Sequence, residues 1–181
     1  MTNDGGWIFA YGSLMWDPGV PVAEALPARL PGWHRSFCLR SIEHRGRPDC
    51  PGLVLGLDAA PGAECRGLAL RIAAPDWPDA IATIRARELV TSAYREAAVN
   101  LDLTDGRHVD ALTYVVRPEH PQYAGGLDLD RQAAIIALAS GGRGPNAAYL
   151  ASFVEHLALL GLNDPEFSAL SERVRSLQRA G

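Results

Sequence analysis

The sequence predicts an α+β fold in which a small mixed β-barrel holds one embedded helix and further helices pack outside it. Two patterns in the 181 residues carry this prediction. Through the first half, short apolar runs alternate with Gly- and Pro-rich breaks, as in strands joined by turns. Beyond Pro121 the apolar residues recur at helical spacing. Because strands and helices are mostly segregated along the chain, a doubly wound parallel sheet is not expected.

The expected strands begin with an apolar run over residues 7–11. This run stops at Gly12-Ser13, so a buried strand is expected to meet a loop there. Further along, Pro, Gly and charged residues interrupt the apolar segments. The other strands expected in this half are 34–42, 53–57 and 67–72, with breaks at 27–32, 44–52 and Pro61-Gly62.

A helix is expected to begin near Asp76, because Asp is a favourable N-cap and Pro78 is tolerated in a first turn. The apolar residues that follow recur at helical spacing and form one stripe. The residues of this stripe are Trp77, Ala80, Ile81 and Ile84.

A β-hairpin is expected after this helix. Residues 97–103 alternate apolar and polar side chains, and residues 109–115 do the same. Asp105-Gly106 lies between them and is a strong turn signal.

The last third of the chain predicts helices. Residues 141–144 are rich in glycine and are interpreted as a helix-to-helix turn. Asn146 is expected to cap the next helix, and Gly161 to follow its end. Asp164 with the following Pro is typical of a helix start. The expected helices are 130–140, 147 to about 160, and 165 to about 178.

Composition narrows the function classes. The chain is 48% hydrophobic and 21% charged, with a net charge of −4. It has no dense Lys/Arg stretch, so a nucleic-acid surface is not expected. A small anionic substrate remains compatible with this charge, because a few arginines suffice to bind one ligand.

Several kinds of segment and site are not expected. Cys38, Cys50 and Cys65 have no CxxC spacing, which favours reduced thiols over a disulfide framework. The five histidines show no HxH or HExxH spacing, so no metal site is expected. Residues 1–6 lack a signal pattern, and no apolar run reaches the roughly 18 residues of a membrane span. We therefore expect a cytoplasmic protein.

Glu88 is the first candidate for chemistry. At about 100° per residue, it lies about 40° from Ile84 and about 20° from Ile81, so it extends the apolar stripe. A carboxylate facing a core is desolvated, which raises its pKa towards the range that a general base needs. The alternative is an ordinary salt bridge with Arg85 or Arg87.

The second candidate is the loop Tyr11-Gly12-Ser13-Leu14. A strand that ends in Gly-Ser exposes consecutive backbone N–H groups with a hydroxyl beside them, and such a turn can bind a carboxylate or an oxyanion. The alternative is an ordinary loop after a buried strand.

Two further residues are candidates for substrate binding. Arg40, like Arg45, is a fork-shaped donor near a breaker-rich loop, and is either a carboxylate ligand or a solvated surface residue. Tyr149 either lines a pocket with its hydroxyl or belongs to the core stripe of its helix.

Four groups of motif residues together resemble one known family. They are Trp7 to Trp16 followed by Asp17-Pro18-Gly19, then His44-Arg45-Gly46 with Pro48 and Pro51-Gly52, then Arg87-Glu88 ahead of Tyr94, and last Gly144 to Leu150. In this order, over about residues 7–155, they resemble the ChaC family of γ-glutamylcyclotransferases. The chain departs from the commonest family pattern at Ala10, where Gly is usual, and at Arg47 and Leu53.

The resemblance implies a γ-glutamylcyclotransferase-like fold, and the length of the chain predicts a single domain over residues 1–181. Residues 162–181 have no counterpart in the resemblance and are expected to form a C-terminal helical extension. The resemblance also implies a lyase that cleaves glutathione into 5-oxoproline and Cys-Gly without a metal or organic cofactor. The substrate's own α-amine is then the nucleophile, which agrees with the absence of a Ser-His or Cys-His pair. Carried over by position, the catalytic acid/base is Glu88, and the substrate loop is Ala10, Tyr11, Gly12, Ser13 and Leu14.

Three functions stay open at this point. The first is cyclotransfer on glutathione. The second is cyclotransfer on another γ-glutamyl amide or amine, since the same base and loop serve any such head group. The third is a non-catalytic ligand-binding or regulatory protein, against which the desolvated Glu88 argues, because a binder of an anion gains nothing from it.

Overall fold

The computed structural model describes residues 5–181. The expectation that no signal segment is present depends in part on residues 1–4, which lie outside the described residues. The described chain divides into two compact units, residues 5–35 with 57–120 and residues 36–56 with 121–181. The expectation of a single domain stays a prediction.

The elements are β1 (Gly6–Ala10), η1 (Ser13–Met15), β2 (Glu24–Ser41), β3 (Gly52–Ile72), α1 (Trp77–Glu88), β4 (Tyr94–Leu103), β5 (His108–Val116), α2 (Leu129–Leu138), β6 (Ser140–Gly141), β7 (Gly144–Pro145), α3 (Asn146–Leu159) and α4 (Pro165–Ala180).

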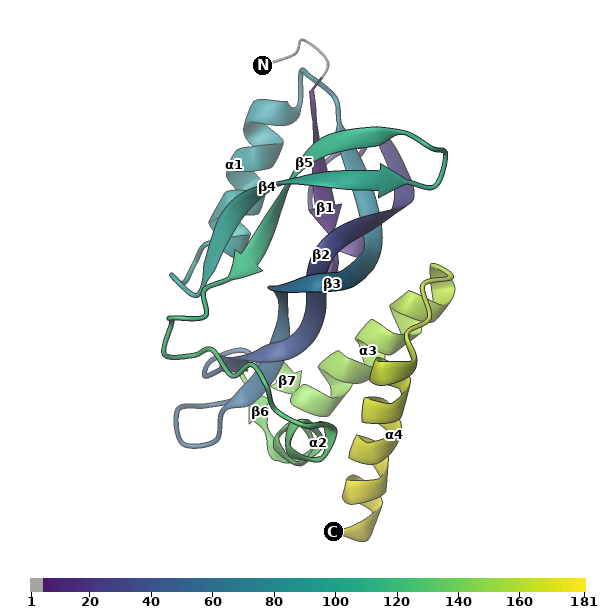
Figure 1. Ribbon diagram of the computed structural model, residues 1–181. Helices are drawn as coiled ribbons and strands as arrows, with labels where there is room; N and C mark the ends of the chain where they lie inside the picture. The colour runs from purple at the N-terminus through teal and green to yellow at the C-terminus, as the bar shows by residue number, and fades with distance from the viewer. Residues whose placement is uncertain (1–4) are drawn as a thin grey trace. The chain divides into compact units, whose positions relative to one another are not determined.

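Five strands close into a barrel in the order β1-β3-β2-β4-β5 (Figure 1). β1 runs antiparallel to β3, from Gly6 opposite Ile72 to Ala10 opposite Leu68. On its other side β1 pairs with β5 in parallel, so the barrel is mixed. The predicted small mixed barrel with helices is therefore confirmed.

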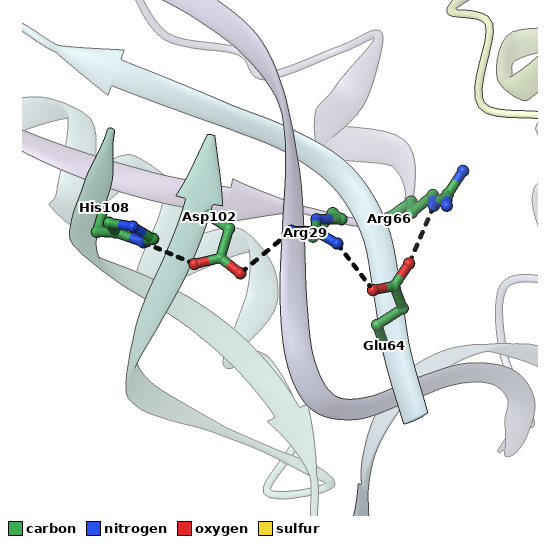
Figure 2. Close-up of polar contacts among 5 residues, drawn as sticks. All are labelled: Arg29, Glu64, Arg66, Asp102 and His108. Atoms are coloured by element: carbon green, nitrogen blue, oxygen red, sulfur yellow. Dashed lines mark hydrogen bonds and ion pairs between the residues drawn. The ribbon is translucent and has the colours of Figure 1, made fainter. Parts of the chain in front are cut away.

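A chain of ion pairs runs across the outer surface of four barrel strands, as Figure 2 shows. Asp102 of β4 lies 2.7 Å from the Nδ1 of His108 on β5 and 3.7 Å from Arg29 on β2. Arg29 also lies 3.5 Å from Glu64 of β3, which contacts Arg66 at 3.2 Å. Since these side chains are partly or largely exposed, each pair contributes little to stability. The pairs follow the strand order of the barrel.

The helix α1 begins where the sequence predicts it, and Pro78 lies in its first turn. Asp76 takes the N-cap position, but its side chain makes no capping hydrogen bond. Ala80, Ile81 and Ile84 are buried, so the predicted apolar stripe faces the interior.

The predicted hairpin is confirmed. β4 and β5 pair antiparallel from Tyr94 opposite Val116 to Asp102 opposite His108. Gly106 at the turn has a φ of +89°, a conformation that glycine adopts without strain.

Two predicted strand breaks are wrong, because β2 and β3 continue through residues 27–32 and through Pro61-Gly62. Gly32 and Gly62 adopt φ values of +81° and +85°, and a Cβ at either position would have no atom within 4 Å. Glycine adopts positive φ readily, so each of these residues redirects a long strand locally where a turn was expected.

The second unit contains three long helices and a small sheet. α4 packs against α2 and α3. Phe37 of β2 contacts Phe153 and Phe167 edge to face, with ring centroids 6.3 and 5.9 Å away. None of the helices within residues 5–181 is long and apolar enough to cross a membrane.

The ends of these helices test several predictions. Asp164 caps α4 by accepting from the N–H of Glu166, and Gly161 follows α3 with a φ of +68°, as expected. Residues 141–144 connect α2 to α3 as expected, and the connection is a tight turn at Gly142-Arg143 flanked by the short strands β6 and β7. Asn146 is not a cap, because it is the first residue of α3 and its side chain bonds elsewhere.

The three cysteines lie in the described part of the chain and are free. Cys38 and Cys65 are buried, and Cys50 is half-buried. The redox state of these thiols stays a prediction.

Candidate active site

The loop after β1 is a single tight turn. The N–H of Met15 donates to the carbonyl of Gly12 at 2.9 Å, and the N–H of Asp17 donates to the carbonyl of Ser13 at 2.9 Å. Ala10 and Leu14 are buried on either side of Gly12 and Ser13, which are both half-buried. Gly12 and Ser13 are therefore the parts of the predicted loop that a ligand can reach.

Tyr11 is anchored at both its side chain and its backbone. Its hydroxyl donates to the carbonyl of Tyr114 at 2.8 Å, inside the barrel. The buried guanidinium of Arg35 donates through Nη1 to the carbonyls of Tyr11, at 2.9 Å, and Arg66, at 3.0 Å. Tyr11 therefore fixes the start of the loop, and its hydroxyl is engaged within the protein.

Glu88 is the last residue of α1, and its side chain is only 21% exposed. Burial desolvates the carboxylate and raises its pKa above the usual value for glutamate, while the positive charge of Arg87 partly opposes this rise. The Nε of Arg87 lies 3.5 Å from Oε1 of Glu88. The half-buried position expected from the apolar stripe is thus present, together with the salt bridge that was its alternative.

Arg87 joins the loop to the helix that carries Glu88. Its Nη2 donates to Oγ of Ser13 at 2.8 Å, and its Nη1 donates to the carbonyl of Asp17 at 2.7 Å. The sequence indicated Arg87 as a possible salt-bridge partner of Glu88 and as a motif residue, but not as a contact of the loop. No local pattern points to Ser13, which lies 74 positions earlier in the chain.

A second network holds α1 on the barrel. Arg85 donates two hydrogen bonds of 2.7 Å to the carboxylate of Glu96 on β4, and this bonding lowers the pKa of Glu96. The hydroxyl of Tyr114 on β5 donates to the same carboxylate at 3.2 Å. Burial raises the pKa of the Tyr114 phenol, and the negative charges of Glu96 and Glu88 raise it further. Glu88 therefore lies within electrostatic range of a buried phenol that stays protonated.

Comparison with known proteins places this chain in a family. A family model described as ChaC-like protein matches residues 6–177. The chain belongs to the ChaC-like family. The match extends into α4, beyond the last group of motif residues, which ends at Leu150.

Individual ChaC-like relatives match most of the chain. It is 38% identical over 171 residues to the glutathione-specific γ-glutamylcyclotransferase of Escherichia coli (strain K12), covering 94% of this chain and 73% of that protein. It is 33% identical over 177 residues to γ-glutamylcyclotransferase 2-3 of Arabidopsis thaliana, covering 94% of this chain and 89% of that protein. A crystal structure of a γ-glutamyl cyclotransferase specific to glutathione from yeast superposes with a TM-score of 0.86 and covers 99% of each chain, at 23% identity. At that identity the superposition supports the fold.

The ChaC-like motifs of the second unit meet at a close backbone crossing. A Cβ at Gly46 would lie 2.0 Å from the nitrogen of Gly52, and one at Gly141 would lie 2.6 Å from the nitrogen of Gly46. The buried amide of Asn146 spans the crossing by accepting from the N–H of Leu53 at 2.7 Å and donating to its carbonyl at 2.8 Å. These motif residues therefore have a structural explanation in chain packing.

The other predicted binding residues of this ChaC-like chain, Arg40 and Tyr149, belong to the second unit, whereas the loop and the base belong to the first. The backbone of Arg40 exchanges two hydrogen bonds with Gln122, of 2.7 and 2.9 Å. Tyr149 is half-buried, contacts Phe37 edge to face, and carries the guanidinium of Arg45 5.2 Å from its ring centroid. The role of both residues in substrate binding stays a prediction.

Proposed function

We propose that this chain is a glutathione-specific γ-glutamylcyclotransferase that converts glutathione into 5-oxoproline and Cys-Gly. The observation that carries the proposal is the half-buried Glu88 carboxylate, with its raised pKa, tied through Arg87 to the loop after β1. The name of the relative in Escherichia coli supports glutathione as the substrate.

In the proposed reaction the substrate supplies its own nucleophile. The α-amine of the γ-glutamyl group attacks the γ-carbonyl carbon, a new C–N bond closes the five-membered ring, and the amide C–N bond to cysteine breaks. Well-oriented intramolecular attack reaches an effective molarity of about 10⁵ M or more, so holding the curled substrate matters as much as the base. The bond changes balance without an oxidant or a reductant.

Glu88 moves the proton in this scheme. It accepts a proton from the substrate ammonium, which frees the amine to attack, and passes this proton to the departing nitrogen of Cys-Gly. The carboxylate then accepts the second proton that the new ring nitrogen loses, and this proton goes to the released Cys-Gly amine, which leaves as an ammonium. Because desolvation raises its pKa, Glu88 is a stronger base than an exposed glutamate while it is still ionised above that pKa.

The loop after β1 holds the substrate. The half-buried Gly12 and Ser13 present backbone N–H groups and a hydroxyl to the α-carboxylate, while the buried Ala10, Tyr11 and Leu14 support them from behind. The predicted contacts of Ala10, Tyr11 and Leu14 with the substrate therefore run through their backbone. A cytoplasmic location and the absence of nucleic-acid and membrane partners stay predictions.

Incubation of the purified chain with glutathione tests the proposal, with 5-oxoproline and Cys-Gly measured by mass spectrometry. We expect both products in equal amounts. Glutathione acetylated on its α-amine is the matched control, and it should give no product because its nucleophile is blocked. Turnover of γ-glutamyl-alanine without turnover of glutathione would contradict the glutathione specificity, and no 5-oxoproline from either would contradict the enzymatic function.

A further inference from the structure

One guanidinium contacts both halves of the proposed catalytic apparatus. Arg87 donates to Oγ of Ser13 at 2.8 Å and to the carbonyl of Asp17 at 2.7 Å, which lie at the two ends of the turn after β1. The same side chain lies 3.5 Å from the carboxylate of Glu88 and 3.6 Å from that of Asp17. Arg87 therefore links the loop directly to the base, in addition to the Arg85–Glu96 contact that holds α1 on the barrel.

The chemistry of this contact sets the direction of the Ser13 hydroxyl. A guanidinium has N–H donors and no acceptor, so the oxygen of Ser13 is the acceptor in the contact with Arg87. The single hydroxyl proton of Ser13 must then point away from Arg87. It is available as a donor to an anionic group that binds at the half-buried face of the loop.

We propose that Arg87 is a positioning residue of the cyclotransfer reaction, an inference that rests on the proposed function. It holds Ser13 as a donor towards the substrate carboxylate, and it keeps the loop and Glu88 at a fixed separation. The reacting α-amine and the α-carboxylate are bonded to the same carbon of the substrate. When Ser13 binds the carboxylate, the distance from the loop to Glu88 therefore decides whether the amine reaches Glu88.

The shape of the Arg87 guanidinium and its positive charge have different effects, so substitutions can separate them. Two nitrogens of the fork are needed to reach Ser13 and the Asp17 carbonyl together, and a lysine cannot replace them. The positive charge acts on Glu88, whose pKa it lowers against the effect of burial. Arg87→Lys therefore removes the fork and keeps the charge, whereas Arg87→Gln removes both.

The position of Arg87 favours folded variants. Its side chain is 33% exposed, and Asp17 is 70% exposed, so no buried polar group is left behind in the barrel interior by either substitution. Arg29→Gln is a matched control, because Arg29 is also partly exposed in the same unit and contacts Glu64 and Asp102 on the outer surface of the barrel (Figure 2). Thermal unfolding of each variant checks that the fold is retained.

The test is the pH profile of kcat/KM for glutathione in the wild type and the variants. We expect Arg87→Lys to lower kcat/KM by about tenfold or more without moving the acidic limb, since misplacement near the reacting atoms costs up to about 10²-fold. We expect Arg87→Gln to lower it similarly and also to move the acidic limb to higher pH, because Glu88 loses the nearby positive charge. Arg29→Gln should change neither kcat/KM nor the pH of the acidic limb.

A double-mutant cycle separates positioning from a general effect on the fold. If Arg87 acts through Ser13, the loss in Ser13→Ala combined with Arg87→Lys is smaller than the product of the two single losses. Multiplicative losses, or an acidic limb that stays in place in Arg87→Gln, would overturn the proposal while the wild type still turns over glutathione. A wild type without turnover would instead contradict the proposed function, and this inference with it.

Discussion

Asn146 offers a direct test of the chain crossing in the second unit. Its side chain is fully buried, and its amide satisfies both backbone groups of Leu53, at 2.7 and 2.8 Å. Asn146→Ala removes both bonds and leaves the N–H and carbonyl of Leu53 buried without these partners. Each buried polar group left unsatisfied costs about 1–3 kcal/mol, so the expected loss in the free energy of unfolding is about 2–6 kcal/mol.

Urea denaturation followed by far-UV circular dichroism measures this loss, because the helices α2, α3 and α4 of the second unit dominate that signal. Natural domains are stable by about 5–15 kcal/mol, so a loss of this size shifts the midpoint clearly and can unfold the chain at 37 °C. Glu155→Ala, at an exposed position on the same helix, is the control and should change stability by less than about 0.5 kcal/mol. A loss below about 1 kcal/mol in Asn146→Ala would refute the reasoning, because one unsatisfied buried group alone costs that much.

Three further predictions concern the loop and the base. Tyr11→Phe removes the buried hydrogen bond to the carbonyl of Tyr114. In the same denaturation assay it should lower the free energy of unfolding by about 1–3 kcal/mol, and it should also lower kcat/KM. An unchanged free energy of unfolding would contradict the anchoring role of Tyr11. Gly67→Ala places a Cβ 2.3 Å from the carbonyl oxygen of Ala10, so it should displace the strand that leads into the loop. The free energy of unfolding should fall by about 1–3 kcal/mol. A variant with wild-type stability and turnover would contradict this prediction. In the wild type, kcat/KM for glutathione should fall as pH drops through the pKa of Glu88. This fall should occur at a pH above the usual range for glutamate, because burial raises the pKa of Glu88. A fall of kcat/KM within the usual range would show that Glu88 is solvated in the free enzyme.

Local patterns in the sequence predicted the elements whose cause is local. The hairpin around Gly106 follows from alternation and a turn dipeptide, and α1 follows from an apolar stripe with a proline in its first turn. The burial of Glu88 follows from the same stripe, because the helical period fixes which side chains share a face.

The predictions that failed depend on distant parts of the chain. Gly32 and Gly62 are typical of turns, yet β2 and β3 continue through them with a locally positive φ, because both strands belong to the barrel. Asn146 has the composition of a helix cap, but its amide instead bonds to Leu53, 93 positions earlier. Arg87 meets Ser13 across 74 positions, and no periodicity in the sequence encodes such a contact.

The central claim is that Glu88 is the acid/base of glutathione cyclotransfer, and turnover by the Glu88→Gln variant tests it most directly. General acid–base catalysis contributes about 10²–10⁴-fold, so 5-oxoproline formation from glutathione should fall by at least about 10²-fold. The fold should be retained or slightly stabilised. The pKa of Glu88 is raised in the folded state, so its ionised form opposes folding above that pKa. This penalty declines as pH falls below the raised pKa and is gone below the ordinary pKa of glutamate. Near-full turnover by a folded Glu88→Gln variant would contradict the account.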